Sequence, residues 1–471
     1  MDRLPREVKE QILRLALDDR DEDENWAGSI ATVSRDWQTL VEPITFKSLH
    51  LTQECLGEAL ADGILTPARQ AYINSISLTT KLPYYYFEGK TLESAKEQNN
   101  LSFSKAVTDL LGLLSAWPSK PCGLRLALFV DFVDYESYAY DEGYAPGLSC
   151  SFTYGFISLR EDFYHQLPEV PCVTEFVSYA INFTSLSIIP KSCCKIASRF
   201  PNLQHIHWKV KDGRQNHSFQ MTLRRDFATG ISMLPRSVRK LSLVCDDNGQ
   251  PTVIQSSIYP RETQDPLSTA LRKFSKQLEC LSLTIIAGPE LFFDPDGDRD
   301  EGCWPLLRKV KVALALRTPW GEPIFNFDFC NPGVNVNSPE AYRIVPISER
   351  VNQYCLAFAR AAARMPKLKT MNIQWRTSTK SNIEYTIDPD SSGAQFLSIS
   401  SPGLDLTGEI QEAWWKAALV HLREGAQFHF VVMDNGERFK HRNRWPFSFG
   451  LRVDVPEPEP FNLIEWTRSE V

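Results

Sequence analysis

A short apolar pattern recurs along the chain, and it constrains the fold more than any other feature of the sequence. The pattern is apolar-x-x-apolar-x-apolar, whose last two apolar residues alternate as in a β-strand with one buried face. Clear copies begin at Leu203, Val238, Leu278, Leu307 and Leu368, and residues 73–78 and 183–188 fit the same form. Each copy therefore predicts one short strand with an apolar side and a polar side.

Helical spacing precedes most of these strands. Apolar residues recur three or four positions apart in four stretches, Val107/Leu111/Leu114, Phe227/Ile231/Leu234, Leu267/Leu271/Phe274 and Val351/Cys355/Phe358. An apolar–proline pair precedes each of four strands, with the prolines at positions 201, 235, 305 and 366. A repeated unit of helix, proline turn and strand is typical of a solenoid, because stacking buries the apolar face that each unit alone exposes.

The spacing of the repeat is irregular. The middle apolar residues of the clear copies stand at positions 206, 241, 281, 310 and 371, so the units differ in length and carry insertions. A mixed α/β domain with a single large sheet is the rival architecture. Beyond the last copy, residues 409–422 have the pattern of a helix and residues 426–433 that of a strand, which we expect to cap the array.

Composition narrows the class of protein. The 471 residues carry a formal net charge of −7, which argues against a general nucleic-acid or membrane-surface binder. No apolar run approaches the roughly 20 residues of a transmembrane helix. The eleven cysteines are odd in number and scattered, as in reduced thiols of a cytoplasmic or nuclear protein.

The first fifty residues predict a small helical unit with a thin core. Apolar residues at helical spacing stand at positions 8, 12, 15 and 16, and again at positions 30, 33, 37 and 40. Pro5 suits the first turn of the first helix, and Pro43 is expected to stop the second. The charged stretch 18–25 between them is expected to be a solvated loop. A unit this small needs support from the rest of the chain or from a partner.

The stretches LPREVKEQIL and ATVSRDWQTLVEPITFKSL in this unit resemble an F-box, the helical module that docks on the Skp-type adaptor of cullin–RING ubiquitin ligases. The run VEPITFKSLHL resembles the continuation seen in filamentous-fungal F-box proteins. The acidic stretch 18–24 departs from the family, which has a shorter, less acidic connector there. The resemblance implies adaptor-binding residues at Leu4, Pro5, Val8, Ile12, Val33 and Trp37. The alternative is a helical cap on the following domain.

The body resembles a degenerate leucine-rich-repeat array, a common companion of the F-box. It lacks the Asn or Cys of the repeat consensus, since Lys211, Asp246, Ile286, Ala315 and Arg376 stand in its place. We therefore expect an α/β fold in which a short N-terminal helical F-box-like module, residues 1–50, precedes an irregular leucine-rich-repeat-like α/β solenoid. The solenoid is expected over 51–376, and a capping region and tail over 377–471.

The polar side of the predicted strands is the expected target-binding face. If the strands stack in parallel, the residues between the apolar ones share one face of the sheet. We expect contacts with a target protein from His205, His207, Lys240, Ser242, Lys309, Lys311, Thr370 and Asn372. The alternative is a solvated face that binds nothing.

The sequence contains no recognisable catalytic motif. A Gly-x-Ser-x-Gly elbow, a phosphate-binding Gly-rich loop and a dinucleotide fingerprint are all missing. The His205–His207 pair has no further ligands at zinc-site spacing, and the aspartates at 294, 296 and 298 depart from the calcium-loop pattern. We expect no cofactor, no metal and no catalytic residue. The expected function is that of a ligase substrate receptor, with a ligase-independent scaffold or an enzyme with a cleft as alternatives.

Overall fold

The structure is a computed structural model, and the residues that it describes fall into fourteen segments. They are 5–18, 34–82, 92–120, 122–132, 156–179, 187–211, 217–246, 264–293, 303–329, 342–376, 381–387, 393–400, 407–421 and 427–434. The expected acidic loop, the aspartates at 294–298 and the expected C-terminal tail lie outside these segments, apart from Asp18 at the end of the first helix.

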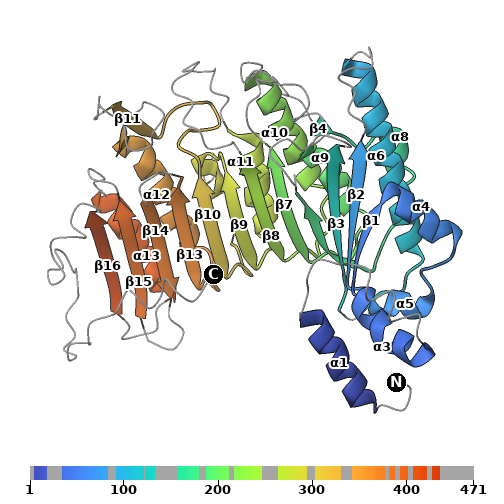
Figure 1. The fold of residues 1–471 in the computed structure, drawn as a ribbon. Helices are drawn as coiled ribbons and strands as arrows, with labels where there is room; N and C mark the ends of the chain where they lie inside the picture. Colours follow the sequence, from blue (N-terminus) through green and yellow to red (C-terminus); the bar gives the residue numbers. More distant parts are fainter. Residues whose placement is uncertain are drawn as a thin grey trace.

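The described residues form a mixed α/β fold around one twelve-stranded sheet (Figure 1). In spatial order its strands are β1 (Ser48–Thr52), β2 (Ser75–Leu82), β3 (Leu124–Phe132), β5 (Val173–Ser178), β7 (His205–Lys211), β8 (Lys240–Asp246), β9 (Cys280–Ile285), β10 (Lys309–Leu314), β13 (Thr370–Trp375), β14 (Ser381–Ile387), β15 (Gly393–Ser400) and β16 (Gln427–Asp434). From β1 to β13 every neighbouring pair is parallel, and the strands follow one another in chain order. The expected parallel stacking is confirmed.

The register of the sheet aligns the middle apolar residues of the sequence pattern. Ile206, Leu241, Leu281, Val310 and Met371 lie opposite one another on successive strands. The first leucine or valine of each copy is buried just before its strand, in the turn that leads into it. In these turns two successive N–H groups donate to one carbonyl of the preceding turn, as the 239 and 240 amides do to Gln204 O (2.8 and 3.0 Å).

Helices cover one face of the sheet and build the core with it. They are α4 (Gln53–Ala61), α6 (Leu92–Ser115), α8 (Glu161–Tyr164), α9 (Pro190–Ala197), α10 (His217–Ile231), α11 (Pro266–Ser275), the 3₁₀ turn η1 (Pro289–Leu291), α12 (Ser348–Ala362) and α13 (Gly408–His421). The short helix α5 (Pro67–Tyr72) has no buried residue and contacts the N-terminal helix Arg35–Thr45. The four helices expected from apolar spacing are confirmed, as are the helix and strand near the C-terminal end of the pattern. Within the described segments, no helix combines the length and apolar character that crossing a membrane requires.

The expected place of residues 183–188 in the sheet was wrong. The described end of 183–188, β6 (Ser187–Ile188), pairs with β4 (Phe156–Ile157) outside the large sheet, and β5 takes the expected place. Consecutive apolar residues at 176 and 177 break the alternation of β5, so the pattern did not predict this strand. A second two-stranded sheet, β11 (Phe325–Phe329) with antiparallel β12 (Tyr342–Pro346), also lies apart.

The N-terminal helices are α1 (Arg6–Asp18) and α3 (Arg35–Thr45). Pro43 does not stop α3, because it stands in the last turn and removes a single N–H donor there; the amide of Phe46 still donates to Glu42 O (2.9 Å). Ser34 caps the start of α3. Figure 1 shows α1 below the strands on the β1–β3 side, apart from the sheet and next to α3.

Candidate interaction surfaces

One side of α1 is anchored to α3. The Lys9 side chain is buried and donates to Asp36 Oδ2 at 3.1 Å. Its Nζ also lies 5.9 Å from the centre of the Trp37 ring, within the range of a cation–π contact. Trp37 itself is only 3% exposed. These contacts fix which side of α1 faces α3.

Another side of α1 presents an apolar stripe, defined here as Val8, Ile12 and Leu15. These side chains are 39%, 41% and 63% exposed. Spacings of four and three residues place them along one side of a helix. An exposed row of large apolar side chains at the end of an acidic chain is a typical mark of a protein-binding surface.

The expected adaptor-binding residues divide into three groups in the structure. Pro5, Val8 and Ile12 are exposed, Leu4 and Val33 lie outside the described residues, and Trp37 is buried. The buried Trp37 side chain supports the helix pair from inside and does not present itself to a partner. No observation tests whether these residues bind an adaptor, so that part stays a prediction.

A polar joint holds α3 to the body. Glu42 accepts hydrogen bonds from Arg69 Nε and Nη2 (3.0 and 2.8 Å) and from the Gln38 amide (2.8 Å). The Arg69 guanidinium also lies 4.8 Å from the centre of the Phe46 ring. Burial raises the pKa of Glu42, but the hydrogen bonds from Gln38 and Arg69 outweigh it and lower the pKa overall. The joint gives α3 a defined orientation relative to α5 and the first strands.

The eight expected target-binding residues lie together on one face of the sheet, which we call the open face. Register places them in two rows, His205–Lys240–Lys309–Thr370 and His207–Ser242–Lys311–Asn372, with β9 contributing Cys280 and Ser282 between β8 and β10. The three lysines are exposed and the others are partly exposed. The alternating apolar residues of the same strands are buried on the helix side.

The open face is cationic between β8 and β10. In the described part of the chain, Lys240, Lys309 and Lys311 form no ion pair. Two acidic residues flank this region: Glu175 on β5 is 3.2 Å from Arg125 Nε and 3.9 Å from His207 Nε2, and Glu384 on β14 lies opposite Asn372. Partial burial, and then the nearby Lys240 charge, lower the pKa of His205. At neutral pH the lysines therefore supply the net charge of this region.

Sequence reasoning missed one part of the open face. Phe129 on β3 and Tyr179, directly after β5, form an aromatic pair with ring centres 6.3 Å apart. Tyr179 is 37% exposed. Neither strand carried the recognised pattern: residues 126–130 of β3 are all apolar, so no alternation marks this strand in the sequence.

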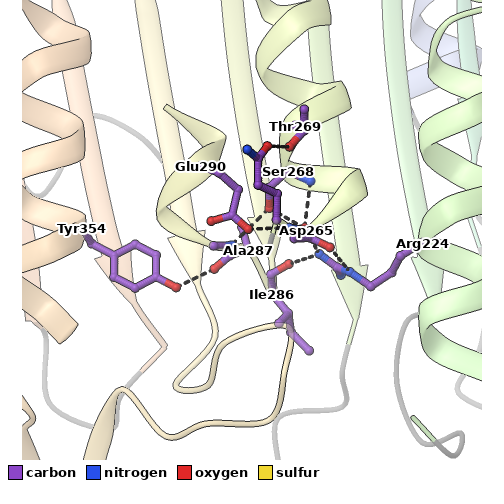
Figure 2. A network of polar contacts seen from close by, with 10 residues as sticks. Arg224, Asp265, Ser268, Thr269, Ile286, Ala287, Glu290 and Tyr354 are labelled. Carbon is purple, nitrogen blue, oxygen red and sulfur yellow. Dashed lines mark hydrogen bonds and ion pairs between the residues drawn. The ribbon is translucent and has the colours of Figure 1, made fainter. Parts of the chain in front are cut away.

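A buried polar network joins the helices behind the sheet (Figure 2). Arg224 on α10 makes a bidentate pair with Asp265 at the start of α11, with distances of 2.9 and 2.6 Å, and also donates to Ile286 O at 2.9 Å. Asp265 Oδ2 accepts from the Ser268 amide, while the Asp265 amide donates to Glu290 Oε1 at 2.7 Å. The Tyr354 hydroxyl on α12 donates to Ala287 O at 2.7 Å.

This network, which we call the clamp, stabilises the packing of the helices; its members are Arg224, Asp265, Ser268, Glu290 and Tyr354. Arg224 and Asp265 are 1% and 0% exposed, so solvent does not reach the pair. Burial raises the pKa of Asp265, but the adjacent Arg224 charge outweighs it and the pKa is lowered. Burial raises the pKa of Glu290. Perturbed carboxylates can mark catalytic sites, but a catalytic group must also meet its substrate. These groups bind one another, the start of α11 and the backbone at 286–288, directly after β9.

The residues that the structure describes contain no group of three or more His, Cys, Asp or Glu arranged to hold a metal ion. The charged neighbours of the paired histidines of β7, His205 and His207, are Lys240 and Glu175. The calcium-like aspartates lie outside the described residues.

Comparison with known proteins gives one match. Residues 341–443 match DUF6546, a family of unknown function. The matched region begins next to β12, includes α12 and α13, and extends beyond β16, so it covers the last part of the sheet. No curated protein and no solved structure matches the chain.

Proposed function

We propose that the chain is a substrate-receptor subunit of a cullin–RING ubiquitin ligase. In this proposal α1 and α3 bind the Skp-type adaptor, and the open face of the sheet binds a target protein. The exposed stripe of α1 is the observation that carries it. Three large apolar side chains are left uncovered on a helix whose other side is anchored to α3 through Lys9.

The body supports the same proposal through its topology. Nine parallel strands follow one another in chain order, and helices cover one face while the other stays open. This is the arrangement expected of an irregular leucine-rich-repeat-like solenoid. In such an architecture the open face is an extended surface for a protein segment, which fits a receptor better than a catalytic cleft.

The work of such a receptor is positional. Holding a target beside the ligase raises its effective concentration, and other subunits carry out the transfer of ubiquitin. The Glu42–Arg69 joint would serve this role because it fixes the adaptor-binding helices relative to the sheet. A loose connection would lower the effective concentration that the receptor creates.

The first test is the affinity of a purified Skp-type adaptor for the intact chain, measured by calorimetry. We expect Ile12→Asp to weaken binding at least about 100-fold, because it places a charge in the centre of a desolvated apolar contact. The matched control is Gln11→Asp, which adds the same charge at the neighbouring exposed position and should change the affinity only about threefold.

Two results would overturn the proposal. One is that the intact chain, with a normal circular dichroism spectrum, does not bind the adaptor at micromolar concentration. The other is that Ile12→Asp and Gln11→Asp bind equally well. A ligase-independent scaffold would then be the better interpretation of the open face.

A further inference from the structure

Three exposed lysines of the open face, Lys240, Lys309 and Lys311, lie at the corners of a triangle. Lys309 and Lys311 stand two residues apart on β10, a separation of about 7 Å between their backbone positions. Lys240 occupies the same row as Lys309 but lies two strands away, at about 10 Å. Since these lysines form no ion pair in the described part of the chain, each is available to an acidic group.

This spacing fits separate carboxylates better than a single phosphate. A phosphate group is usually held by several donors that converge on it, often including a bidentate arginine. Here Arg125 is paired with Glu175 at 3.2 Å, and the lysines do not converge. An extended segment rises about 3.3 Å per residue, so acidic residues three positions apart would reach Lys240 and Lys309.

The aromatic pair supplies a second contact for the same segment. Tyr179 and Phe129 lie beside each other, and the Tyr179 ring is partly exposed. Tyr179 lies two strand spacings from β8 and, by register, four residues along the strands from the row of Lys240, so the two positions are about 16 Å apart. An extended segment covers that distance in about five residues, and Lys309 lies about three residues further. Tyrosine is among the side chains that most often anchor protein interfaces.

We propose that the open face binds an extended, carboxylate-rich protein segment with acidic residues about five and eight positions from an aromatic residue. The lysines of β8 and β10 bind the carboxylates, and the Phe129–Tyr179 pair binds the aromatic side chain. The inference rests on the proposed function in one respect, namely that this segment belongs to the target. The binding chemistry itself is independent of any adaptor.

The test uses fluorescence anisotropy with the full chain and a labelled peptide of about twelve residues. The probe carries one tryptophan, glutamates about five and eight positions after it, and serine, glycine and threonine elsewhere. We expect binding at low salt, and a loss of at least tenfold for a probe with lysine in place of the glutamates. Charge reversal by Lys309→Glu with Lys311→Glu should also weaken binding at least tenfold.

A matched control distinguishes the effect of charge reversal on the open face from the effect of the change in net charge. Lys96→Glu with Lys105→Glu changes the net charge equally on exposed positions of α6, and we expect it to change the affinity less than about twofold. If the reversed β10 variant unfolds, Lys309→Gln with Lys311→Gln replaces it, with a weakening of about threefold or more. Tyr179→Ala should weaken binding of the tryptophan probe and leave a probe without tryptophan unchanged.

Several results would overturn the inference. They are no binding of the probe up to millimolar concentration, equal weakening by the α6 control, or tighter binding of a phosphoserine peptide or a short oligonucleotide than of the glutamate probe. Adaptor affinity is measured separately on the same variants. A chain that binds the adaptor but not the probe contradicts this inference alone, whereas the reverse result contradicts the proposed ligase role alone.

Discussion

Replacing Asp265 by Ala is expected to lower the free energy of unfolding by about 3–5 kcal/mol, the cost of leaving one partner of a buried ion pair uncompensated. Arg224 is 1% exposed and would keep its charge without the bidentate acceptor. The Ser268 amide in the first turn of α11 would also lose the carboxylate oxygen that accepts its hydrogen bond. Urea unfolding followed by circular dichroism measures the change. A lower midpoint with an unchanged slope is the expected form of the result.

Two further variants test whether the burial of the Arg224–Asp265 ion pair is the reason for the loss of stability. Glu412→Ala removes an exposed ion pair with Lys416 on α13 and should leave the midpoint nearly unchanged. The double change Arg224→Met with Asp265→Leu removes both buried charges, so it should cost less than the sum of the two single changes. If Asp265→Ala behaves like Glu412→Ala, the pair is not buried and the clamp of Figure 2 is wrong.

Gly123→Ala is expected to destabilise the fold by about 2–4 kcal/mol. Gly123 has φ = +68°, a conformation that costs an L-residue about 1 kcal/mol or more. A Cβ at this position would also lie 1.9 Å from Thr174 Oγ1 and 2.5 Å from Thr174 Cγ2. The close approach holds the start of β3 against β5, and overpacking of this kind costs about 1–3 kcal/mol.

Gly63 provides the control for the energetic cost of the left-handed backbone conformation. Its φ is +61°, but a Cβ there would meet nothing within 4 Å, so Gly63→Ala should cost only about 1 kcal/mol. Thr174→Ala combined with Gly123→Ala should recover part of the loss, because the smaller side chain leaves room. Equal midpoints for the two glycine variants would contradict the described packing of β3 against β5.

Much of the sheet could be predicted from sequence because its repeating unit is local. The strand pattern encodes a buried residue in the turn and two on the helix side, so β7, β8, β9, β10 and β13 were found with their register. β5 was missed because Phe176 and Val177 are both buried, which removes the alternation that marks a one-sided strand.

The open face was predicted as a row of residues, but its charge balance was not. The sequence shows lysines and histidines between the apolar positions, yet the Arg125–Glu175 pair depends on which strand lies beside β3. The clamp was also beyond prediction, because Arg224, Asp265 and Glu290 meet through helix packing between residues far apart in the chain. The burial of Trp37 depends on how α1 and α3 pack, which their apolar spacing alone does not determine.

We propose that one chain joins a cullin–RING ligase through α1 and leaves the open face free for a target. The most direct measurement is the mass of the particles formed when the purified chain is mixed with adaptor, cullin and RING subunit, measured by analytical ultracentrifugation. We predict one species that contains all four proteins and still binds the acidic probe, and we predict that Ile12→Asp leaves the chain out of it. Separate sedimentation of the intact chain and the ligase subunits would contradict the claim.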